Sequence, residues 1–128
     1  MEKKHYHKWL FLVAAIWNWI IGLLFIIVSI LAMLLAATLF EIAIPPSLVF
    51  IHTFFGFVFV FGFGFYFVSI DINNNRGIVK MAVIEKLFVF IVFLFYFIVG
   101  DLNFLGVIPV IIDLIFGCLF IEFLLNYK

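Results

Sequence analysis

Four long apolar runs, separated by short polar connections, dominate the pattern of hydrophobic and polar positions along the chain. They extend from Trp9 to about Phe40, from Leu48 to Ile70, from Ile78 to Val99 and from Phe104 to Leu125. Each run is longer than the roughly 18 residues above which an apolar segment is a candidate transmembrane helix. The pattern therefore predicts four membrane-spanning helices.

The first run is longer than one membrane crossing needs. As a single helix its roughly 32 residues would extend about 48 Å, whereas the hydrocarbon core of a bilayer is about 30 Å thick. We therefore expect this helix to tilt, to protrude from the membrane or to break near Ala36, before Pro45 and Pro46.

The connections between the runs are short and determine the predicted topology. They cover Glu41 to Ser47, Asp71 to Gly77 and Gly100 to Asn103, and connections of this length place consecutive helices side by side and antiparallel. The expected fold is all-α: a polytopic membrane protein, an antiparallel up-down bundle of four transmembrane helices, with residues 1–128 forming one domain.

The basic residues are distributed unevenly between the two ends of such a bundle. The loops at one end carry Glu41 and Asp101 and no base. At the other end lie six of the seven bases: Lys3, Lys4, Lys8, Arg76, Lys80 and Lys128. Because bases are enriched in cytoplasmic loops, the sequence predicts a multi-pass protein of the cell membrane with both termini in the cytoplasm.

The composition agrees with a lipid environment and excludes several classes of protein. Of the 128 residues, 70% are hydrophobic and 11% are charged, against about 25% charged in soluble domains, so a water-soluble globule is excluded. A formal net charge of zero argues against a nucleic-acid partner, which needs clustered Lys and Arg. The one cysteine, Cys118, excludes an internal disulfide.

Four polar residues are predicted to lie within the membrane. At 1.5 Å per residue from the end that carries the termini, the estimated depths are about 13 Å for Asn18, 10 Å for Glu85, 12 Å for Lys86 and 18 Å for Asp113. Lys86 and Asp113 are expected to pair between the third and fourth helices, since an isolated charge at a helix centre costs roughly 2.5 to 3.5 kcal/mol. Glu85 lies about 100° around the helix from Lys86, which leaves a neighbouring helix, a second protomer and a water-filled crevice open as its surroundings.

Small residues recur at helical spacing on the first and last helices, and they are expected to mark close helix contacts. On the last helix the stripe comprises Gly106, Pro109, Asp113 and Gly117. On the first helix it comprises Ala14, Asn18, Gly22, Ser29, Ala32 and Ala36.

Motifs for catalysis and for metal binding are lacking. The sequence has no phosphate-binding Gly-rich loop, no HExxH and no Cys cluster, so we expect no catalytic residue, no metal and no cofactor. His5 and His7 are interpreted as an exposed HxH at the terminus, and His52 as a hydrogen-bonding residue near a helix end. Glu122 is interpreted as an interfacial residue.

Three segments resemble a set of small, uncharacterised prokaryotic four-helix membrane proteins. They are FGFGFYFVSIDINNNRGIV at Phe61–Val79, EKLFVF at Glu85–Phe90 and DLIFGCLF at Asp113–Phe120. The resemblance covers roughly the last 70 residues and implies the four-span topology, but it carries no established activity. In architecture alone the chain is similar to DoxX-like proteins and to the emopamil-binding and sigma-2 receptor group, from which no ligand residue is transferred.

Three functions fit this sequence. The favoured hypothesis is a bundle that binds a lipid or lipophilic small molecule in a cavity, with Asn18, Glu85, Lys86 and Asp113 at the polar end of the ligand. The alternatives are a small oligomeric transporter or channel for ions or solutes, and a structural subunit of a larger membrane complex. The expected partners are membrane lipids, a lipophilic ligand, and either copies of the same chain or a larger complex.

Overall fold

Five α-helices and no strands make up residues 2–127, the part of the chain that the computed structural model describes. They are α1 (Glu2–Leu31), α2 (Met33–Phe40), α3 (Val49–Ile70), α4 (Arg76–Val99) and α5 (Phe104–Asn126). All of them except α2 are long and apolar enough to cross a membrane. The predicted all-α class with four candidate spans is confirmed.

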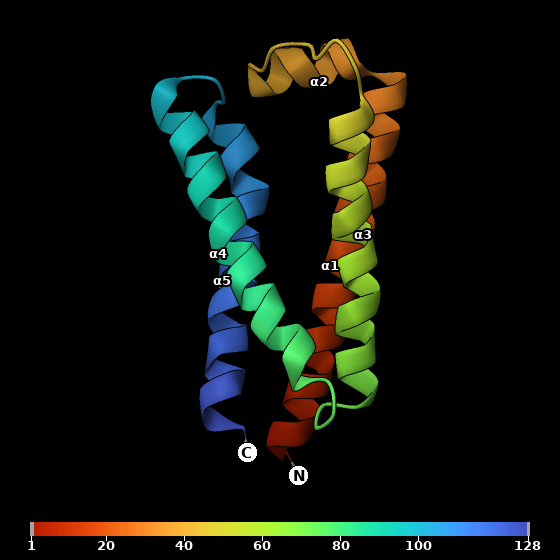
Figure 1. The fold of residues 1–128 in the computed structure, drawn as a ribbon, viewed down its shortest axis with the longest axis vertical. Helices are drawn as coiled ribbons and strands as arrows, with labels where there is room; N and C mark the ends of the chain where they lie inside the picture. The colour runs from red at the N-terminus through yellow and green to blue at the C-terminus, as the bar shows by residue number, and fades with distance from the viewer. Residues whose placement is uncertain (1, 128) are drawn as a thin grey trace.

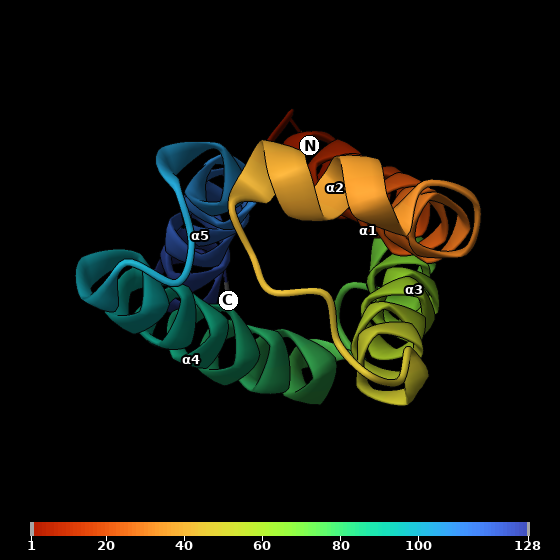
Figure 2. The same ribbon diagram turned by 90° about the horizontal axis from the view of Figure 1, so that it is seen from above.

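The four long helices form two closely packed pairs, α1 with α3 and α4 with α5. The pairs meet at the end of the molecule where both termini lie and separate toward the opposite end (Figure 1). Seen from that opposite end, the helices surround a central space in the order α1, α3, α4, α5, with α2 crossing from α1 toward α5 (Figure 2). Consecutive long helices run antiparallel, as expected from their short connections.

The first apolar run does break, but four residues earlier than predicted. Ala32 leaves the helical conformation (φ −146°, ψ 40°), and α2 then runs across the end of the bundle (Figure 1). The prolines cannot cause this break, because they lie beyond the end of α2, which stops at Glu41 in the left-handed conformation. A straight helix would carry the leucines of α2 past the hydrocarbon core into water, and the turn at Ala32 avoids that cost.

Side chains at helix ends satisfy backbone groups that the helices leave free. Asn103 caps α5 by accepting a hydrogen bond from the backbone N–H of Gly106. At the other end of α5, Arg76 donates to the carbonyl oxygens of Leu124 and Tyr127. These contacts replace the intrahelical partners that terminal N–H and C=O groups lack.

Asp71 organises the loop between α3 and α4. Its carboxylate accepts hydrogen bonds from the side chain and the backbone N–H of Asn74. The side-chain hydrogen bond is the main reason why the pKa of Asp71 lies below its ordinary value.

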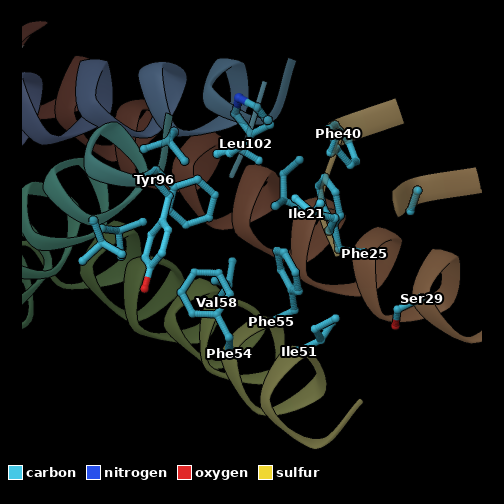
Figure 3. A pocket seen from close by; sticks show the side chains of 18 of the residues that line it. Ile21, Phe25, Ser29, Phe40, Ile51, Phe54, Phe55, Val58, Tyr96 and Leu102 are labelled. Atoms are coloured by element: carbon cyan, nitrogen blue, oxygen red, sulfur yellow. The ribbon is translucent and has the colours of Figure 1, made fainter. Parts of the chain in front are cut away.

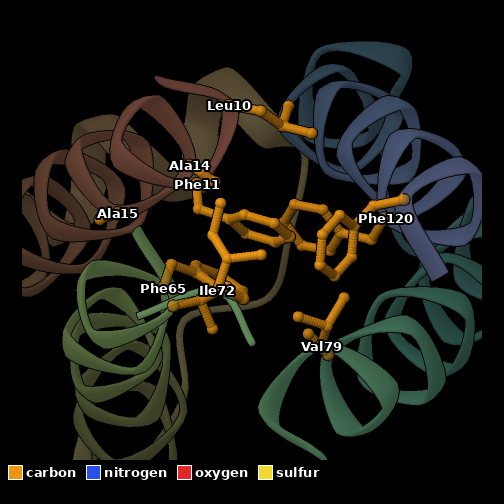
Figure 4. Packing of buried hydrophobic residues seen from close by; sticks show 11 residues of the cluster. Leu10, Phe11, Ala14, Ala15, Phe65, Ile72, Val79 and Phe120 are labelled. Atoms are coloured by element: carbon orange, nitrogen blue, oxygen red, sulfur yellow. The ribbon is translucent and has the colours of Figure 1, made fainter. Parts of the chain in front are cut away.

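The cluster of buried hydrophobic side chains lies at the end of the bundle that carries the termini. Phe11 of α1 stacks on Phe120 of α5 with 5.0 Å between ring centroids, and Phe65 of α3 approaches Phe120 to 5.1 Å. Val79 of α4 and Phe123 of α5 complete this core, which all four long helices share (Figure 4). We call these five residues the aromatic core; its rings join the two helix pairs.

The small residues lie at helix contacts, as predicted, but the contacts differ in tightness. A Cβ atom on Gly22 would lie 2.8 Å from the Phe59 Cβ and 2.9 Å from the Phe55 carbonyl oxygen, both on α3. A Cβ on Gly117 would instead meet the Lys86 Cβ at 3.5 Å, an ordinary van der Waals distance. Of these two contacts, the one at Gly22 is too close for a methyl group and the one at Gly117 is not.

The contact at Gly22 predicts a difference between two alanine substitutions. Gly22→Ala should lower the free energy of unfolding by about 1 to 3 kcal/mol, because the added methyl group meets backbone atoms that cannot move aside. Gly56→Ala is the matched control, since a Cβ there has no neighbour within 4 Å. Thermal unfolding of the detergent-purified variants measures the effect; equal melting temperatures would contradict it.

Candidate functional site

A buried ion pair joins α4 to α5 near the middle of the bundle. The Lys86 Nζ donates to the Asp113 Oδ1 at 2.6 Å, and only 1% of the Lys86 surface is exposed. The pair predicted from the depths of the two residues is confirmed. Because α4 and α5 are antiparallel neighbours, Lys86 and Asp113 face each other across one helix contact.

Two aromatic rings and a second carboxylate also lie close to the ammonium group. The Lys86 Nζ is 5.3 Å from the Phe65 ring centroid and 6.0 Å from that of Phe120, distances typical of cation–π contacts. The Oε2 of Glu85 lies 3.9 Å from the same nitrogen and has no hydrogen-bond partner within residues 2–127. The Glu85 carboxylate thus lies against Lys86, its neighbour in the chain, which was not among the three surroundings left open for it.

Asn18 does not join this group. Its side-chain amide donates to the carbonyl oxygen of Val58 at 3.1 Å and links α1 to α3. The structure therefore brings together three of the four predicted site residues, which we call the polar cluster: Glu85, Lys86 and Asp113. Asn18 lies on the predicted stripe but turns toward α3, because α1 packs most closely against that helix.

A cavity of about 690 Å³ lies between the two helix pairs, on the side of the ion pair away from the aromatic core. Asp113, Trp17, Val58 and Phe88 are the lining residues of the four long helices nearest to that core, so they form the cavity floor. Side chains from α1, α3 and α4 point into a shared space in Figure 3. The other lining residues of the long helices include Ile21, Phe25, Val28, Phe54, Phe55, Val89, Val92, Phe93, Gly106, Pro109 and Val110.

Helix α2 closes the far end of this cavity. Met33, Ala36 and Phe40 line the cavity from α2. The end of α2 is held on α5 by Asn103, whose side chain donates to the Leu39 carbonyl at 2.7 Å and whose N–H donates to the Phe40 carbonyl at 3.1 Å. One asparagine thus caps α5 and fastens the helix that covers the cavity.

The cavity walls are apolar, and their few charged groups share one sign. Asp113 on the floor and Asp101 near α2 are the two charged residues that line the cavity, and no Lys, Arg or His among residues 2–127 does so. A carboxylate accepts hydrogen bonds and cannot donate them. The arrangement can therefore hold an apolar molecule and accept hydrogen bonds from its polar end.

Sequence reasoning missed a polar contact at the end that carries the termini. The interpretation of His7 as exposed is wrong: only 2% of its surface is exposed, and its Nε2 lies 3.4 Å from the Glu122 Oε2 on α5. A usable signal was present, since His7 precedes Phe11, Ala14 and Asn18 at helical spacing on the buried face of α1. The helix predicted from the apolar run begins at Trp9 and therefore leaves His7 out.

His52 lies at the other end of the bundle, away from the polar cluster. Its Nε2 is 3.0 Å from the Ser29 Oγ, which joins α3 to α1. This geometry agrees with its interpretation as a hydrogen-bonding residue near a helix end. Within residues 2–127, no group of three His, Cys, Asp or Glu side chains is placed to hold a metal ion.

Comparison with known proteins adds no relative to this description. No protein-family model, no curated protein and no solved structure matches the chain. The structure supports the coarse part of the resemblance, a small all-helical protein with four candidate membrane spans. The relation to DoxX-like proteins or to the emopamil-binding and sigma-2 receptor group has no further support.

The ion pair predicts strong coupling between two substitutions. Lys86→Met or Asp113→Leu alone should each lower the free energy of unfolding by about 3 to 5 kcal/mol, because each leaves one buried charge without its partner. The double variant should recover much of this loss, since neither charge remains. Denaturant unfolding of the four proteins gives the coupling energy, and single effects that simply add would contradict a direct pair.

Proposed function

We propose that this protein binds a lipid or a lipophilic small molecule in the cavity between its two helix pairs. The observation that carries the proposal is the cavity of about 690 Å³ that ends at Asp113. Small-molecule sites have volumes of roughly 300 to 1,000 Å³, apolar walls and a few polar groups that orient the ligand. The cavity and Asp113 at its floor fit these three criteria.

The exposure of the lining residues supports access from the lipid phase. Phe50 on α3 and Phe88 on α4 both line the cavity, yet 82% and 66% of their surfaces are exposed. Lining residues on the opposite side, such as Ala36 and Val110, are buried. The cavity is therefore most open between α3 and α4, where a membrane protein faces hydrocarbon.

The cavity also separates this proposal from a purely structural role for the polar cluster. If Lys86 and Asp113 only fixed the packing of α4 on α5, a closely packed interior would suffice on both sides of the pair. Close packing is found toward the aromatic core, whereas the opposite side is hollow. An apolar hollow of this size is poorly hydrated, which favours occupation by hydrocarbon.

We also propose that both termini face the cytoplasm. The two termini lie at the same end of the bundle (Figure 1), and Lys3, Lys4, Lys8, Arg76 and Lys80 belong to the segments at that end. The sixth base of the predicted set, Lys128, lies outside the described residues. The positive-inside rule supports this orientation.

Cysteine labelling tests the orientation. In a Cys118→Ala background, Ser47→Cys should react with a membrane-impermeant maleimide on intact cells, because the loop between α2 and α3 would face outward. Asn74→Cys is the matched variant in the loop at the opposite end, and it should react only after the cells are permeabilised. The reverse pattern would invert the proposed topology.

A substitution that fills the cavity tests ligand binding. Val92→Trp places an indole ring in the cavity and should reduce the fraction of protein that carries a lipid or lipophilic adduct by about tenfold, because a ligand cannot share that volume. The readout is native mass spectrometry of the detergent-purified protein.

Ile91→Trp is the control for this experiment. The same ring is added one residue away, on a face that is 63% exposed and does not line the cavity. Adducts that persist in Val92→Trp, or that disappear equally in both folded variants, would contradict binding in the cavity.

A further inference from the structure

The depth and the volume of the cavity limit the shape of the ligand that it can hold. Along α1 the lining residues extend from Trp17 at the floor to Ser29, a rise of roughly 18 Å. Along α4 they extend from Phe88 at the floor to Tyr96, a rise of roughly 12 Å. Dividing the volume of about 690 Å³ by this depth gives a mean cross-section of roughly 40 to 60 Å².

An extended hydrocarbon chain needs much less than this cross-section. Chains in van der Waals contact lie about 4 to 4.5 Å apart, so each chain occupies roughly 16 to 20 Å². One chain would leave at least half of the cavity cross-section empty, and the wall on that side would lose its contacts. Two flexible chains side by side come close to filling it.

The depth of the cavity also determines how much of each chain it can enclose. Carbon–carbon single bonds of about 1.5 Å, arranged in a zigzag, advance a chain by roughly 1.25 Å per carbon. A depth of roughly 12 to 18 Å therefore encloses about 10 to 14 carbons of each chain.

The polar residues of the lining favour a lipid head at the α2 end of the cavity. Tyr96 and Asp101 line the cavity at that end, and both are exposed; Tyr is enriched where a membrane meets water. At the floor, the Asp113 carboxylate is already neutralised by the Lys86 ammonium at 2.6 Å. The ends of the chains can therefore reach the floor, while the head stays near the membrane surface and keeps its hydration.

The opening between α3 and α4 has the right position for such a lipid to enter. It extends from Phe50, in the first turn of α3, to Phe88 at the floor, and these residues are 82% and 66% exposed. Phe54 and Phe93 approach each other across it, with 6.3 Å between ring centroids. A lipid can move in sideways without drawing its head through hydrocarbon, because flexible chains pass such rings by rotation about their single bonds.

We propose, on the basis of the proposed function, that the cavity binds one lipid with two hydrocarbon chains and an uncharged head, as in a diacylglycerol. Both chains lie side by side between the helix pairs and end at the cavity floor. The head lies at the α2 end beside Tyr96 and Asp101. The Asp101 carboxylate accepts hydrogen bonds, which suits the hydroxyl group of such a head.

Two probes with the same kind of head and different numbers of chains test this proposal: monolauroylglycerol and dilauroylglycerol. Native mass spectrometry of the detergent-purified protein, with each probe at the same mole fraction in the detergent, gives the number of molecules bound. We expect saturation at one dilauroylglycerol or at two monolauroylglycerols per protein. Dilauroylglycerol should also bind at least about tenfold more tightly, because its second chain binds intramolecularly.

A substitution that narrows the cavity separates filling of the cross-section from simple partitioning of the probes. Val89→Phe adds a ring to the cavity wall on α4, and the ring takes the space of one chain. The affinity for dilauroylglycerol should fall at least about tenfold, because its second chain no longer fits. Monolauroylglycerol should saturate at one molecule instead of two.

Ile91→Phe is the matched control on the same helix. Ile91 is 63% exposed and does not line the cavity, so this variant should bind both probes as the wild-type protein does.

Saturation of the wild-type protein at one monolauroylglycerol, equal affinity for the two probes, or tighter binding of cholesterol than of dilauroylglycerol would overturn the two-chain proposal while leaving lipid binding intact. Unchanged binding of dilauroylglycerol in folded Val89→Phe would do the same. Binding of none of these probes would instead contradict the proposed function itself.

Discussion

The need to neutralise the buried ammonium of Lys86 is the constraint on which the rest of the structure depends. A charge without a partner at this depth would cost several kcal/mol, and Asp113 on the neighbouring helix supplies the partner at 2.6 Å. This contact sets the register of α4 against α5. Phe65 and Phe120 then lie against the ammonium from the side of the aromatic core, and the cavity lies on the other side. The ion pair thus marks the boundary between the closely packed and the hollow part of the bundle.

The two parts are stabilised in different ways. Toward the termini, rings from α1, α3 and α5, the packing of Val79 from α4 against them and the contact of His7 with Glu122 hold the helix pairs together. Toward α2 the pairs separate, and backbone hydrogen bonds from Asn103 fasten α2 across the opening. A bundle held together at one end can enclose a ligand at the other without losing its fold. This division gives the lipid-binding proposal its physical basis, since the hollow part carries little of the packing between the pairs.

The sequence predicted part of the candidate site correctly. Lys86 and Asp113 could be paired from two facts. Their estimated depths are similar, and the short connection forces α4 and α5 to be antiparallel neighbours. Asn18 has a similar depth but donates to Val58, since depth does not specify which neighbour a residue faces. His7 was missed because the predicted helix began after it, although its spacing from Phe11 and Ala14 continues the buried face. The ligand-binding roles assigned to these residues remain predictions.

The apolar runs and the short connections between them were sufficient to predict the four long helices, their antiparallel order and a membrane environment. Hydrocarbon leaves no alternative for a run of this length, because backbone groups there must find their partners within the helix. Three features depended on the folded arrangement: the break at Ala32, the burial of His7 and the cavity that ends at Asp113. The break at Ala32 places α2 across the end of the bundle, the burial of His7 requires α5 beside α1, and the cavity depends on the distance between the two helix pairs. That distance follows from the sum of many weak contacts in three dimensions, and hydrophobic periodicity along one helix contains no measure of it.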